Sequence, residues 1–365
     1  MFVGNLTPLM IICGICGITS EEPALYVTLL QNAMLAAGII TLIQLWSIGP
    51  VGGQVPVIMG TSSGFLGVMK GVAANPAMGG GILAYSAIIG AAMVGGACEA
   101  VLGFFIKPLR KFFPPVVTGS VVLAIGLSLI SVGVNSFAGG SGAKDFGSLP
   151  NLLLGLLVLA VIVVLKHFTK GITSTSCILC GIIVGYIVAS VMGFVLPHEL
   201  VDAEGNAYTA AWYVNWSRIA DASWFSVPQI LPVKPTFNFN AIFSILIMFL
   251  VTAVETIGDI SGCIEGGMGR EATAKELSGG VVCDGVGSVI SSLFSSLPTT
   301  SFSQNVGLVT MTKVVNRMAL TCGAVFLVLA GLSPKLAAVI SIMPQSVLGG
   351  AAVMMFASIA VSGIK

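Results

Sequence analysis

Two short stretches of the 365-residue chain decide what kind of fold it can adopt. The first reads Gln54-Val-Pro-Val-Ile-Met-Gly-Thr-Ser-Ser-Gly-Phe65, and the second reads Leu297-Pro-Thr-Thr-Ser-Phe-Ser-Gln-Asn-Val-Gly307. Each begins as an extended, proline-containing segment rich in β-branched or hydroxyl residues, and then passes through small polar residues into an apolar, helix-like run. Two ordinary loops would be the alternative interpretation, but the apolar flanks disfavour it.

The composition around these stretches is that of a membrane protein. Hydrophobic residues make up 56% of the chain and charged residues only 8%, whereas soluble domains carry about 25% charged residues. The 46 glycines suit close packing of helices in a bilayer. Irregular backbone facing lipid would leave its polar groups unsatisfied, so both stretches are expected to line a cavity. A matched pair of interrupted segments indicates inverted repeats with a binding site near the middle of the membrane.

Long apolar runs predict a helical protein that crosses the bilayer many times. The run from Met1 to Cys13 is shorter than the roughly 20 residues that a span requires, so we interpret it as the end of a first helix. The chain also stops at Lys365 directly after an apolar run, and we expect truncation at both ends. About eleven full spans follow the partial first helix: 26–46, 54–72, 81–106, 114–137, 150–165, 174–196, 241–262, 278–294, 297–312, 314–332 and 336–363.

One long polar stretch, residues 197–240, separates two groups of spans. It contains three of the four tryptophans, Trp212, Trp216 and Trp224, as an interfacial loop with aromatic anchors would. Ten of the fifteen lysines and arginines fall in alternate loops on the other side of the predicted topology. The positive-inside rule therefore places these basic loops in the cytoplasm and the aromatic loop outside the cell membrane.

Other sequence features argue against an enzyme. Two Cys-x-x-Cys pairs, Cys13/Cys16 and Cys177/Cys180, could indicate a metal or redox site. Both lie in apolar runs without a neighbouring histidine, so we interpret them as packing residues and expect no metal and no cofactor. The chain lacks a G-x-x-x-x-G-K-[ST] sequence, which argues against a built-in ATPase. Its net charge of +1 gives no reason to expect nucleic-acid binding.

Four acidic residues, Glu99, Glu255, Asp259 and Asp284, fall inside predicted spans. Acids in a membrane are costly and are functional candidates by default. Glu255 and Asp259 are four residues apart, so they share a helix face that must look into protein or water. Asp284 lies among small residues and is expected to hydrogen-bond the exposed backbone of a broken segment. Glu99 is interpreted as a structural partner for a nearby base or backbone group.

The second broken stretch continues into a recognisable signature. Residues Gln304-Asn-Val-Gly-Leu-Val-Thr-Met-Thr-Lys313 match every fixed position of the pattern Q/E-N-x-G-x-x-x-x-T-R/K/G. This pattern resembles the signature of the nucleobase–ascorbate transporter family, also called nucleobase:cation symporter-2, and in particular its xanthine and uric acid permeases. The matching positions are Gln304, Asn305, Gly307, Thr312 and Lys313. Residues 253–259, 278–285 and 344–351 resemble the family's eighth, ninth and twelfth helices.

The resemblance implies an all-α polytopic membrane fold with an inverted 7+7 transmembrane repeat. In that fold two broken helices carry short antiparallel strands, and the two broken stretches fall at their places. Residues 1–196 would form the first repeat, 197–240 the extracytoplasmic loop, and 241–365 a second repeat without its last two helices. A core domain would hold the substrate against a supporting gate domain, and a homodimer is left open.

By the same resemblance, Glu255 would bind the substrate from the eighth helix and Gln304 from the tenth. Backbone amides near Ser303 and around Ser62 and Ser63 would assist them. A xanthine or urate edge presents N–H donors beside C=O acceptors. A carboxylate only accepts hydrogen bonds, whereas a carboxamide donates and accepts, so Glu255 and Gln304 together match such a mixed edge.

The remaining polar residues are expected to support this pair. Asn305 would brace the broken backbone, and Asp259 and Asp284 would tune Glu255 or hold the fold. Because burial favours the neutral form of a carboxyl group, Glu255 or Asp259 could take up a proton near neutral pH. The expected function is therefore uptake of a purine nucleobase, such as xanthine or uric acid, with protons as the coupling ion.

Three alternatives stay open at this point. Uracil permeases of the same family tend to carry glutamate at the position of Gln304, so the glutamine favours purines. An anion transporter of the same architecture would need a basic residue facing the site, and the broken segments contain none. A channel or a non-transporting scaffold belongs to another class. Buried acids at a broken helix argue against a scaffold, and uptake with competition would separate a carrier from a channel.

Overall fold

A computed structural model of the chain describes all residues except 1, 107–114, 141–142, 202–206, 221 and 365. Its contacts divide it into two compact units. Unit 1 comprises Met1–Gly126, Ser223–Ala337 and Ile359–Lys365, and unit 2 comprises Leu127–Ala222 and Ala338–Ser358. Each unit takes segments from both predicted repeats, so the units and the repeats divide the chain differently. The repeats stay a prediction.

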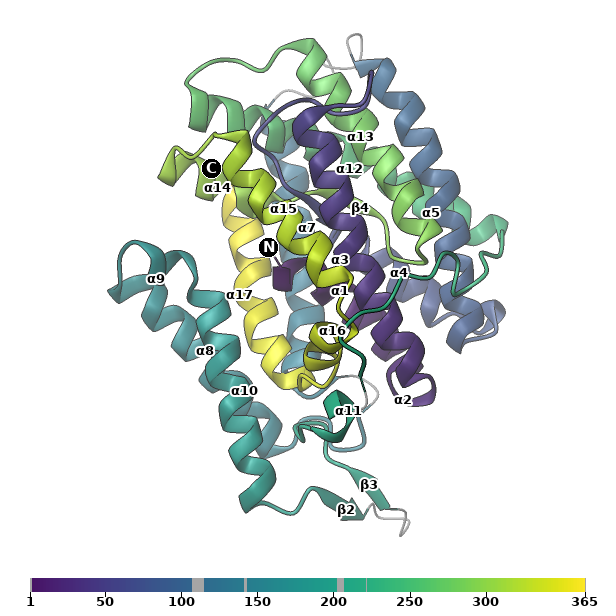
Figure 1. The fold of residues 1–365 in the computed structure, drawn as a ribbon, viewed down its shortest axis with the longest axis vertical. Coiled ribbons are helices and arrows are strands. Elements are labelled where there is room, and N and C mark those ends of the chain that lie inside the picture. The colour runs from purple at the N-terminus through teal and green to yellow at the C-terminus, as the bar shows by residue number, and fades with distance from the viewer. Residues whose placement is uncertain (1, 107–114, 141–142, 202–206, 221, 365) are drawn as a thin grey trace. The chain divides into compact units, whose positions relative to one another are not determined.

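Unit 1 is a helical body around one short strand pair (Figure 1). Its helices and the helical turn η1 are α1 (Phe2–Ile15), α2 (Ile18–Glu21), α3 (Pro23–Trp46), α4 (Leu66–Ala73), η1 (Pro76–Met78), α5 (Gly81–Phe104), the first half of α7 (Pro115–Phe137), α12 (Phe239–Met268), α13 (Ala274–Leu293), α14 (Ser303–Thr312), α15 (Arg317–Gly331), the start of α16 (Pro334–Ser341) and the end of α17 (Gln345–Ile364).

Local sequence signals set where the long helices begin and end. The side chain of Asn238 accepts hydrogen bonds from the first amides of α12, which ends at Gly269 in the left-handed conformation (φ 68°). Thr273 and Glu276 form a reciprocal capping box at the start of α13. Such caps satisfy backbone groups that have no partner inside the helix.

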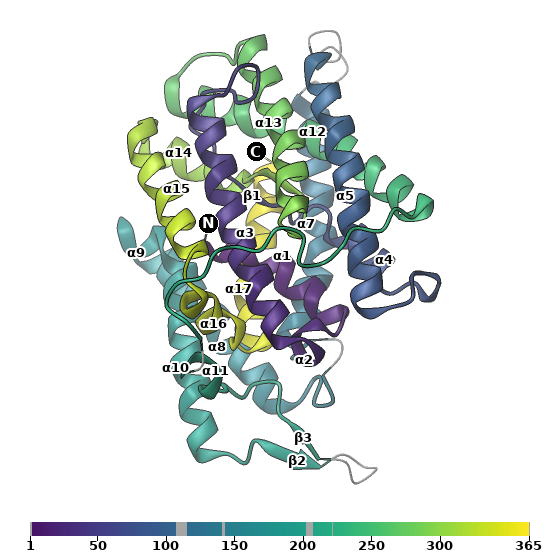
Figure 2. The same ribbon diagram turned by 45° about the vertical axis from the view of Figure 1, so that its right-hand side comes forward.

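Glycines allow two helix pairs of unit 1 to pack backbone against backbone. Helices α5 and α13 lie side by side in Figures 1 and 2, and a Cβ atom added to Gly96 would lie 2.8 Å from the carbonyl oxygen of Gly285. Helices α3 and α15 lie equally close, since a Cβ atom on Gly331 would lie 2.6 Å from the backbone nitrogen of Leu35. The high glycine content thus serves close helix packing, as the composition predicts.

The broken segments meet as a two-stranded antiparallel sheet. Strand β1 (Met59–Thr61) pairs with β4 (Thr299–Ser301), with Gly60 opposite Thr300. All six residues are buried, and each strand is followed by a helix, α4 or α14. The prediction of short antiparallel strands at these two places is confirmed.

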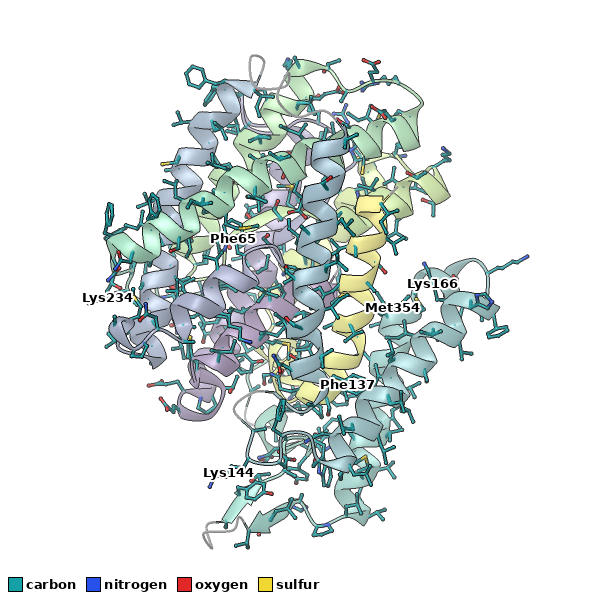
Figure 3. The ribbon with its side chains drawn as sticks, turned by 180° about the vertical axis from the view of Figure 1, so that it is seen from behind. Phe65, Phe137, Lys144, Lys166, Lys234 and Met354 are labelled. Atoms are coloured by element: carbon teal, nitrogen blue, oxygen red, sulfur yellow. The ribbon has the colours of Figure 1, made fainter. Side chains whose placement is uncertain are left out.

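Unit 2 consists of the second half of α7, α8 (Leu149–Phe168), α9 (Ile172–Thr175), α10 (Cys177–Val195), the hairpin β2 (Glu199–Val201) and β3 (Ala207–Thr209), α11 (Ser217–Ala220), the end of α16 and most of α17 (Gln345–Ile364). Figure 3 labels Phe137 on α7 and Met354 on α17. The ring of Phe137 would lie 2.9 Å from a Cβ atom on Gly155 of α8. A Cβ atom on Gly349 of α17 would lie 2.0 Å from the nitrogen of Phe137, so glycines also set the spacing here.

In the described residues, five helices are long and apolar enough to cross a membrane: α3, α5, α8, α10 and α12. A sixth span results if α15 and α16, which are bent by 86°, count as one. The expected number of about eleven full spans stays a prediction. Residues 336–363 do not form the single span expected of them, because α16 ends at Ser341 and α17 begins at Gln345. Pro344 lies in this break, and a proline has no N–H for a helix hydrogen bond.

Candidate substrate site

Polar side chains of the surrounding helices hold the backbone of the strand pair. Thr41 of α3 bonds both backbone groups of Met59, donating to its oxygen at 3.0 Å and accepting from its nitrogen at 3.1 Å. Asn5 of α1 accepts the amide of the last residue of β1 at 2.7 Å. Ser288 of α13 bonds both backbone groups of Thr299, each at 3.0 Å. Buried backbone that is not helical is satisfied in this way inside the protein.

Asn305 connects the two broken segments. Its Nδ2 donates to the carbonyl oxygen of Pro56 at 2.7 Å, and its side chain is buried. Pro56 lies three residues before β1, whereas Asn305 lies in the first turn of α14 after β4. This is the geometry that a bracing residue needs, and the bracing role itself stays a prediction.

The two acids of α12 lie beside the start of α14. Glu255 and Asp259 are both buried, and their side chains contact the same hydroxyl group. The Oγ of Ser303 lies 3.0 Å from Glu255 Oε1 and 3.1 Å from Asp259 Oδ2. Asp259 Oδ2 also accepts a hydrogen bond from Ser301 of β4 at 2.6 Å. The structure therefore brings Glu255, Asp259 and Ser303 together.

Asp284 of α13 reaches the same strand through hydroxyl groups. Its Oδ2 accepts from Thr256 Oγ1 at 2.5 Å and from Thr300 Oγ1 at 3.0 Å. We expected Asp284 to bond the exposed backbone of a broken segment, but the bonds observed are to side chains. Ser288, one turn further along α13, makes the backbone bonds instead.

These contacts form one chain of hydroxyl groups and carboxyl groups. It runs from Glu255 through Ser303, Asp259 and Ser301 to Thr256 and Asp284, with 3.3 Å between the oxygens of Ser301 and Thr256. In the described part of the chain, no lysine, arginine or histidine forms an ion pair with these acids. The Ser303 hydroxyl has one proton and faces two carboxyl groups. Both contacts are hydrogen bonds only when a carboxyl group supplies a second proton.

One corner of the site holds two buried oxygens that lack a partner among the described residues. They are Glu255 Oε2 and Ser62 Oγ. A Cβ atom added to Gly64 would lie 3.5 Å from each of these oxygens and 3.5 Å from the Cε of Met248. Buried polar atoms nearly always have a hydrogen-bond partner. The two partnerless oxygens beside Gly64 therefore mark a place where a ligand could supply hydrogen-bond donors.

The groups around this corner are not all as expected. The amide of Ser62 donates to the carbonyl oxygen of Pro298 at 2.8 Å, so its hydroxyl rather than its amide is available to a ligand. Ser63 is half-buried, and its carbonyl oxygen accepts from Leu66. Phe65, which directly follows Gly64 and is labelled in Figure 3, is buried and packs edge-on against Phe249 with ring centroids 4.6 Å apart.

The signature residues divide along α14. Gln304 lies in the first turn of this helix, but its side chain is outside the described part of the structure. At the other end, Thr312 Oγ1 bonds the carbonyl oxygen of Leu308 at 2.7 Å. Lys313 ends the helix in the left-handed conformation (φ 55°) and donates to the carbonyl oxygen of Gly266 on α12. Gly307 lies between these ends, so only the start of the signature is near the acids.

Sequence reasoning missed the hydroxyl and amide groups that complete the site. Thr256, Thr300 and Ser301 link the acids, whereas Asn5, Thr41 and Ser288 hold the strands. The sequence does indicate Thr256, which directly follows Glu255 on α12, and the Thr-Thr-Ser run of β4, which lies in a broken segment. Asn5 gave none, because a single polar residue in an apolar helix has many structural uses.

The two Cys-x-x-Cys pairs consist of free thiols. Cys13, Cys16 and Cys177 are buried free thiols, and Cys180 is a half-buried one. Among the described residues, no group of three or more His, Cys, Asp or Glu side chains could hold a metal ion. The burial agrees with the packing role.

A helical membrane body with buried acids beside two broken segments is the arrangement expected of a membrane transport protein. The sequence model of a permease family, Xan_ur_permease, matches residues 1–365. The chain therefore belongs to the xanthine/uracil permease family, which is the nucleobase:cation symporter-2 family that its signature resembles. It is a membrane permease rather than an enzyme.

Curated relatives cover almost the whole chain. It is 38% identical over 338 residues to the putative purine permease CPE0397 of Clostridium perfringens. This alignment covers 92% of this chain and 69% of that protein. It is 34% identical to the uric acid permease PucK of Bacillus subtilis, over 100% of this chain and 78% of that protein. The xanthine permease of Bacillus subtilis is also 34% identical, over 100% of this chain and 77% of that protein.

Solved structures share the fold at low sequence identity. The transmembrane domain of a cyanobacterium bicarbonate transporter, BicA, superposes with a TM-score of 0.63 at 16% identity, covering 98% of this chain and 87% of that chain. The structure of SLC26A9 gives 0.60 at 14% identity, covering 98% of this chain and 57% of that chain. At such identities the likeness concerns the fold alone.

Proposed function

We propose that this chain takes up a purine nucleobase, such as xanthine or uric acid, across the plasma membrane by proton symport. The observation that carries the proposal is the buried Glu255 Oε2, which has no partner among the described residues and would lie 3.5 Å from a Cβ atom at Gly64. A carboxylate there requires N–H donors from the substrate, and a purine dione edge supplies them. The names of the relatives, a uric acid permease and a xanthine permease, support the same substrate class.

The proposed binding set combines acceptors with groups that can donate. Glu255 accepts N–H donors of the substrate, and the hydroxyl of Ser62 donates or accepts as the substrate requires. The carboxamide of Gln304 provides one donor and one acceptor from the start of α14. Backbone amides at the start of α14, near Ser303, and around Ser63 are further donors in this proposal. The buried ring pair Phe65 and Phe249 would offer the substrate an apolar contact.

The proton-coupling step is assigned to the acids around Ser303. Glu255 and Asp259 share the single hydroxyl proton of Ser303, so one added proton completes both hydrogen bonds. Proton uptake also removes a negative charge that no described cationic side chain neutralises. Asp284 accepts two hydroxyl donors without sharing one with Glu255 or Asp259, and we assign it to support of the site.

The wider architecture is proposed from the family and the fold. The chain would be built on an inverted 7+7 repeat, with residues 1–196 in the first repeat, 241–365 in the second and 197–240 outside the cell. Its Lys- and Arg-rich loops would be cytoplasmic. The paired strands β1 and β4, which come from the two proposed repeats, support this arrangement.

Two other substrates are less compatible with the site. Uracil remains a candidate, because it shares the N–H and C=O pattern of one purine ring, but Gln304 stands where uracil permeases tend to carry glutamate. An anion such as bicarbonate is suggested by the fold neighbour BicA. The site presents buried carboxyl groups and no ion-paired cation in the described residues, which disfavours an anion.

The test is uptake of labelled substrate by cells that lack purine permeases and express the chain. We expect xanthine or urate uptake, competition by the other purine, weak competition by uracil and none by bicarbonate. Uptake should fall when a protonophore collapses the proton gradient. Uptake of bicarbonate or uracil in preference to purines would overturn the substrate assignment, and insensitivity to the proton gradient would overturn the coupling.

A further inference from the structure

Glu99 is a fourth buried acid, and the proposed substrate chemistry does not use it. It lies on α5, is only 2% exposed, and sits between the close contacts that Gly96 and Gly103 make with α13. A Cβ atom on Gly103 would lie 2.6 Å from a methyl group of Val282, and the contact at Gly96 is equally tight. Protein rather than solvent therefore surrounds the carboxyl group of Glu99.

The hydrogen-bond partner of Glu99 is a threonine of α12. Glu99 Oε1 lies 3.3 Å from Thr252 Oγ1, and Glu99 Oε2 has no partner among the described residues. The same threonine oxygen lies 3.3 Å from the carbonyl oxygen of Met248 and 3.2 Å from that of Phe249. A base was one expected partner of Glu99, but no described lysine, arginine or histidine pairs with it.

The number of protons available at these contacts favours a neutral carboxyl group on Glu99 over an ionised one. The Thr252 hydroxyl has one proton and three acceptors around it, so an ionised Glu99 would receive at most a shared, long hydrogen bond. A neutral Glu99 donates its own proton to Thr252 Oγ1, while Thr252 donates to a carbonyl oxygen of its helix. The charged groups that act on Glu99 from the packed helices, Glu255 of α12 and Asp284 of α13, are themselves acids. Ionisation of Glu99 would therefore add a buried charge without a counterion.

Thr252 occupies a position from which it can set the orientation of the site. It precedes Glu255 by three residues and Asp259 by seven, so all three lie on the same face of α12. We propose that Glu99 is a positioning residue that acts as a neutral carboxylic acid, donating to Thr252 and so fixing the face of α12 that carries Glu255 and Asp259. Glu99 itself touches no substrate, and its effect on transport rests on the proposed function.

Infrared spectroscopy tests the protonation of Glu99 without any substrate. The purified chain should show the C=O stretch of a buried neutral carboxylic acid at about pH 5 and still at about pH 9, beyond the ordinary range of carboxyl titration. In the spectrum of the unaltered chain minus that of Glu99→Gln, this band should appear at both pH values, because the bands of the other buried acids cancel. Glu265→Gln, at an exposed position on the same helix as Thr252, should give no such difference. A difference band that is absent at either pH would overturn the proposal.

Substrate binding tests the positioning role. Glu99→Gln retains a neutral donor and should leave affinity and its pH profile unchanged, whereas Glu99→Ala and Thr252→Val should each weaken binding by about fivefold to tenfold. The double variant should be no weaker than either single one, because both remove the same contact. Thr252→Ser keeps the hydroxyl and should bind like the unaltered chain. Thr28→Val removes a threonine hydroxyl that bonds the carbonyl oxygen of Ala24 in its own helix, and it should have no effect.

The outcomes separate this proposal from the proposed function. Loss of binding or of pH dependence in Glu99→Gln would mean that Glu99 must ionise, and additive effects in the double variant would mean that the Thr252 contact is not its route of action. If Glu99→Ala does not fold, the Thr252 variants still decide. Failure of purine binding by the unaltered chain would sink the proposed function while leaving the infrared result intact.

Discussion

At the scale of single residues, the site is a set of acids connected by hydroxyl groups. The spacing of Glu255 and Asp259 predicted that they share a face, and both contact Ser303. The hydroxyl groups that connect them could not be predicted, because serine and threonine are common in membrane helices and a single sequence does not show which of them face an acid. The number of protons in this network, rather than the number of contacts, then decides whether each carboxyl group accepts or donates a hydrogen bond.

Replacing Glu255 with glutamine should strongly weaken substrate binding and leave membrane insertion intact. The change turns one acceptor oxygen into an N–H₂ donor that would oppose the donors of the substrate. Hydrogen bonds to charged groups contribute about 1.5–3 kcal/mol, so affinity should drop by about tenfold to a hundredfold. Equilibrium binding of labelled xanthine and urate measures this, with Glu265→Gln as the control at an exposed position of the same helix. Unaltered affinity in Glu255→Gln would refute the assignment.

Replacing Gln304 with glutamate should weaken purine binding by about tenfold or more, because a buried polar group of the substrate loses its partner at a cost of about 1–3 kcal/mol. Two nearby carboxylates would also repel, so one should take up a proton as the pH falls and become a donor again. Purine affinity should therefore partly recover at low pH, and uracil competition could improve. Competition assays at several pH values measure both effects. Purine affinity that is unchanged at every pH would remove the main support for choosing purines over uracil.

At the scale of structural elements, the broken segments owe their stability to side chains of helices far away in the sequence. The Pro- and Gly-containing stretches predicted irregular backbone, and the strands β1 and β4 appear at the predicted places. Their anchors, Thr41 on α3 and Ser288 on α13, could not be predicted, since the partner of a polar side chain depends on helix packing. Irregular backbone is thus predictable from sequence, whereas the groups that satisfy it are not.

Ser288→Ala should destabilise the fold around β4. It removes a hydroxyl that bonds both backbone groups of Thr299, and it leaves two buried polar groups unpaired, each at a cost of about 1–3 kcal/mol. We expect a lower midpoint of thermal unfolding for the detergent-purified chain. Ser292→Ala is the matched control, because Ser292 lies one turn later and its hydroxyl donates to the carbonyl oxygen of Ser288 in its own helix, not to β4. Equal midpoints for the two variants would contradict the anchoring role.

The capping box of α13 should make a small, pH-dependent contribution to the free energy of unfolding. The hydrogen bond from Arg270, together with donors from Thr273, lowers the pKa of Glu276 to about 2. Glu276 lies before the predicted span 278–294. Because the pKa is lower in the folded state, this contribution is present above the ordinary glutamate pKa of about 4.3 and is lost as the pH falls towards 2. Thermal unfolding at pH 6 and at about pH 3 should show a smaller acid-induced drop for Glu276→Gln than for the unaltered chain. The same drop in both would contradict this.

At the scale of the whole molecule, composition alone predicted a multi-spanning membrane protein, and the signature predicted its family. The way segments combine into compact units could not be predicted. Unit 2 joins residues 127–222 with 338–358. This grouping could not be predicted, because tertiary contacts between distant segments leave no periodic pattern in the sequence. The break at Pro344 was missed for a related reason. The apolar pattern of 336–363 is continuous, so only the missing N–H of the proline marks where the helix ends.

The proposed orientation of the chain can be tested by chemical labelling. The exposed residues Cys98 and Cys322 would first be replaced by serine. A cysteine replacing Trp224, which is 77% exposed and lies in the loop proposed to be outside, should react in intact cells with a maleimide that cannot cross membranes. A cysteine replacing Glu271, which is exposed beside the basic residue Arg270, should react only after the cells are permeabilised. The physical reason is the distribution of lysine and arginine, which are retained on the cytoplasmic side during insertion. The reverse pattern would place the basic loops outside, and labelling at both positions in intact cells would mean that the chain lacks a single orientation.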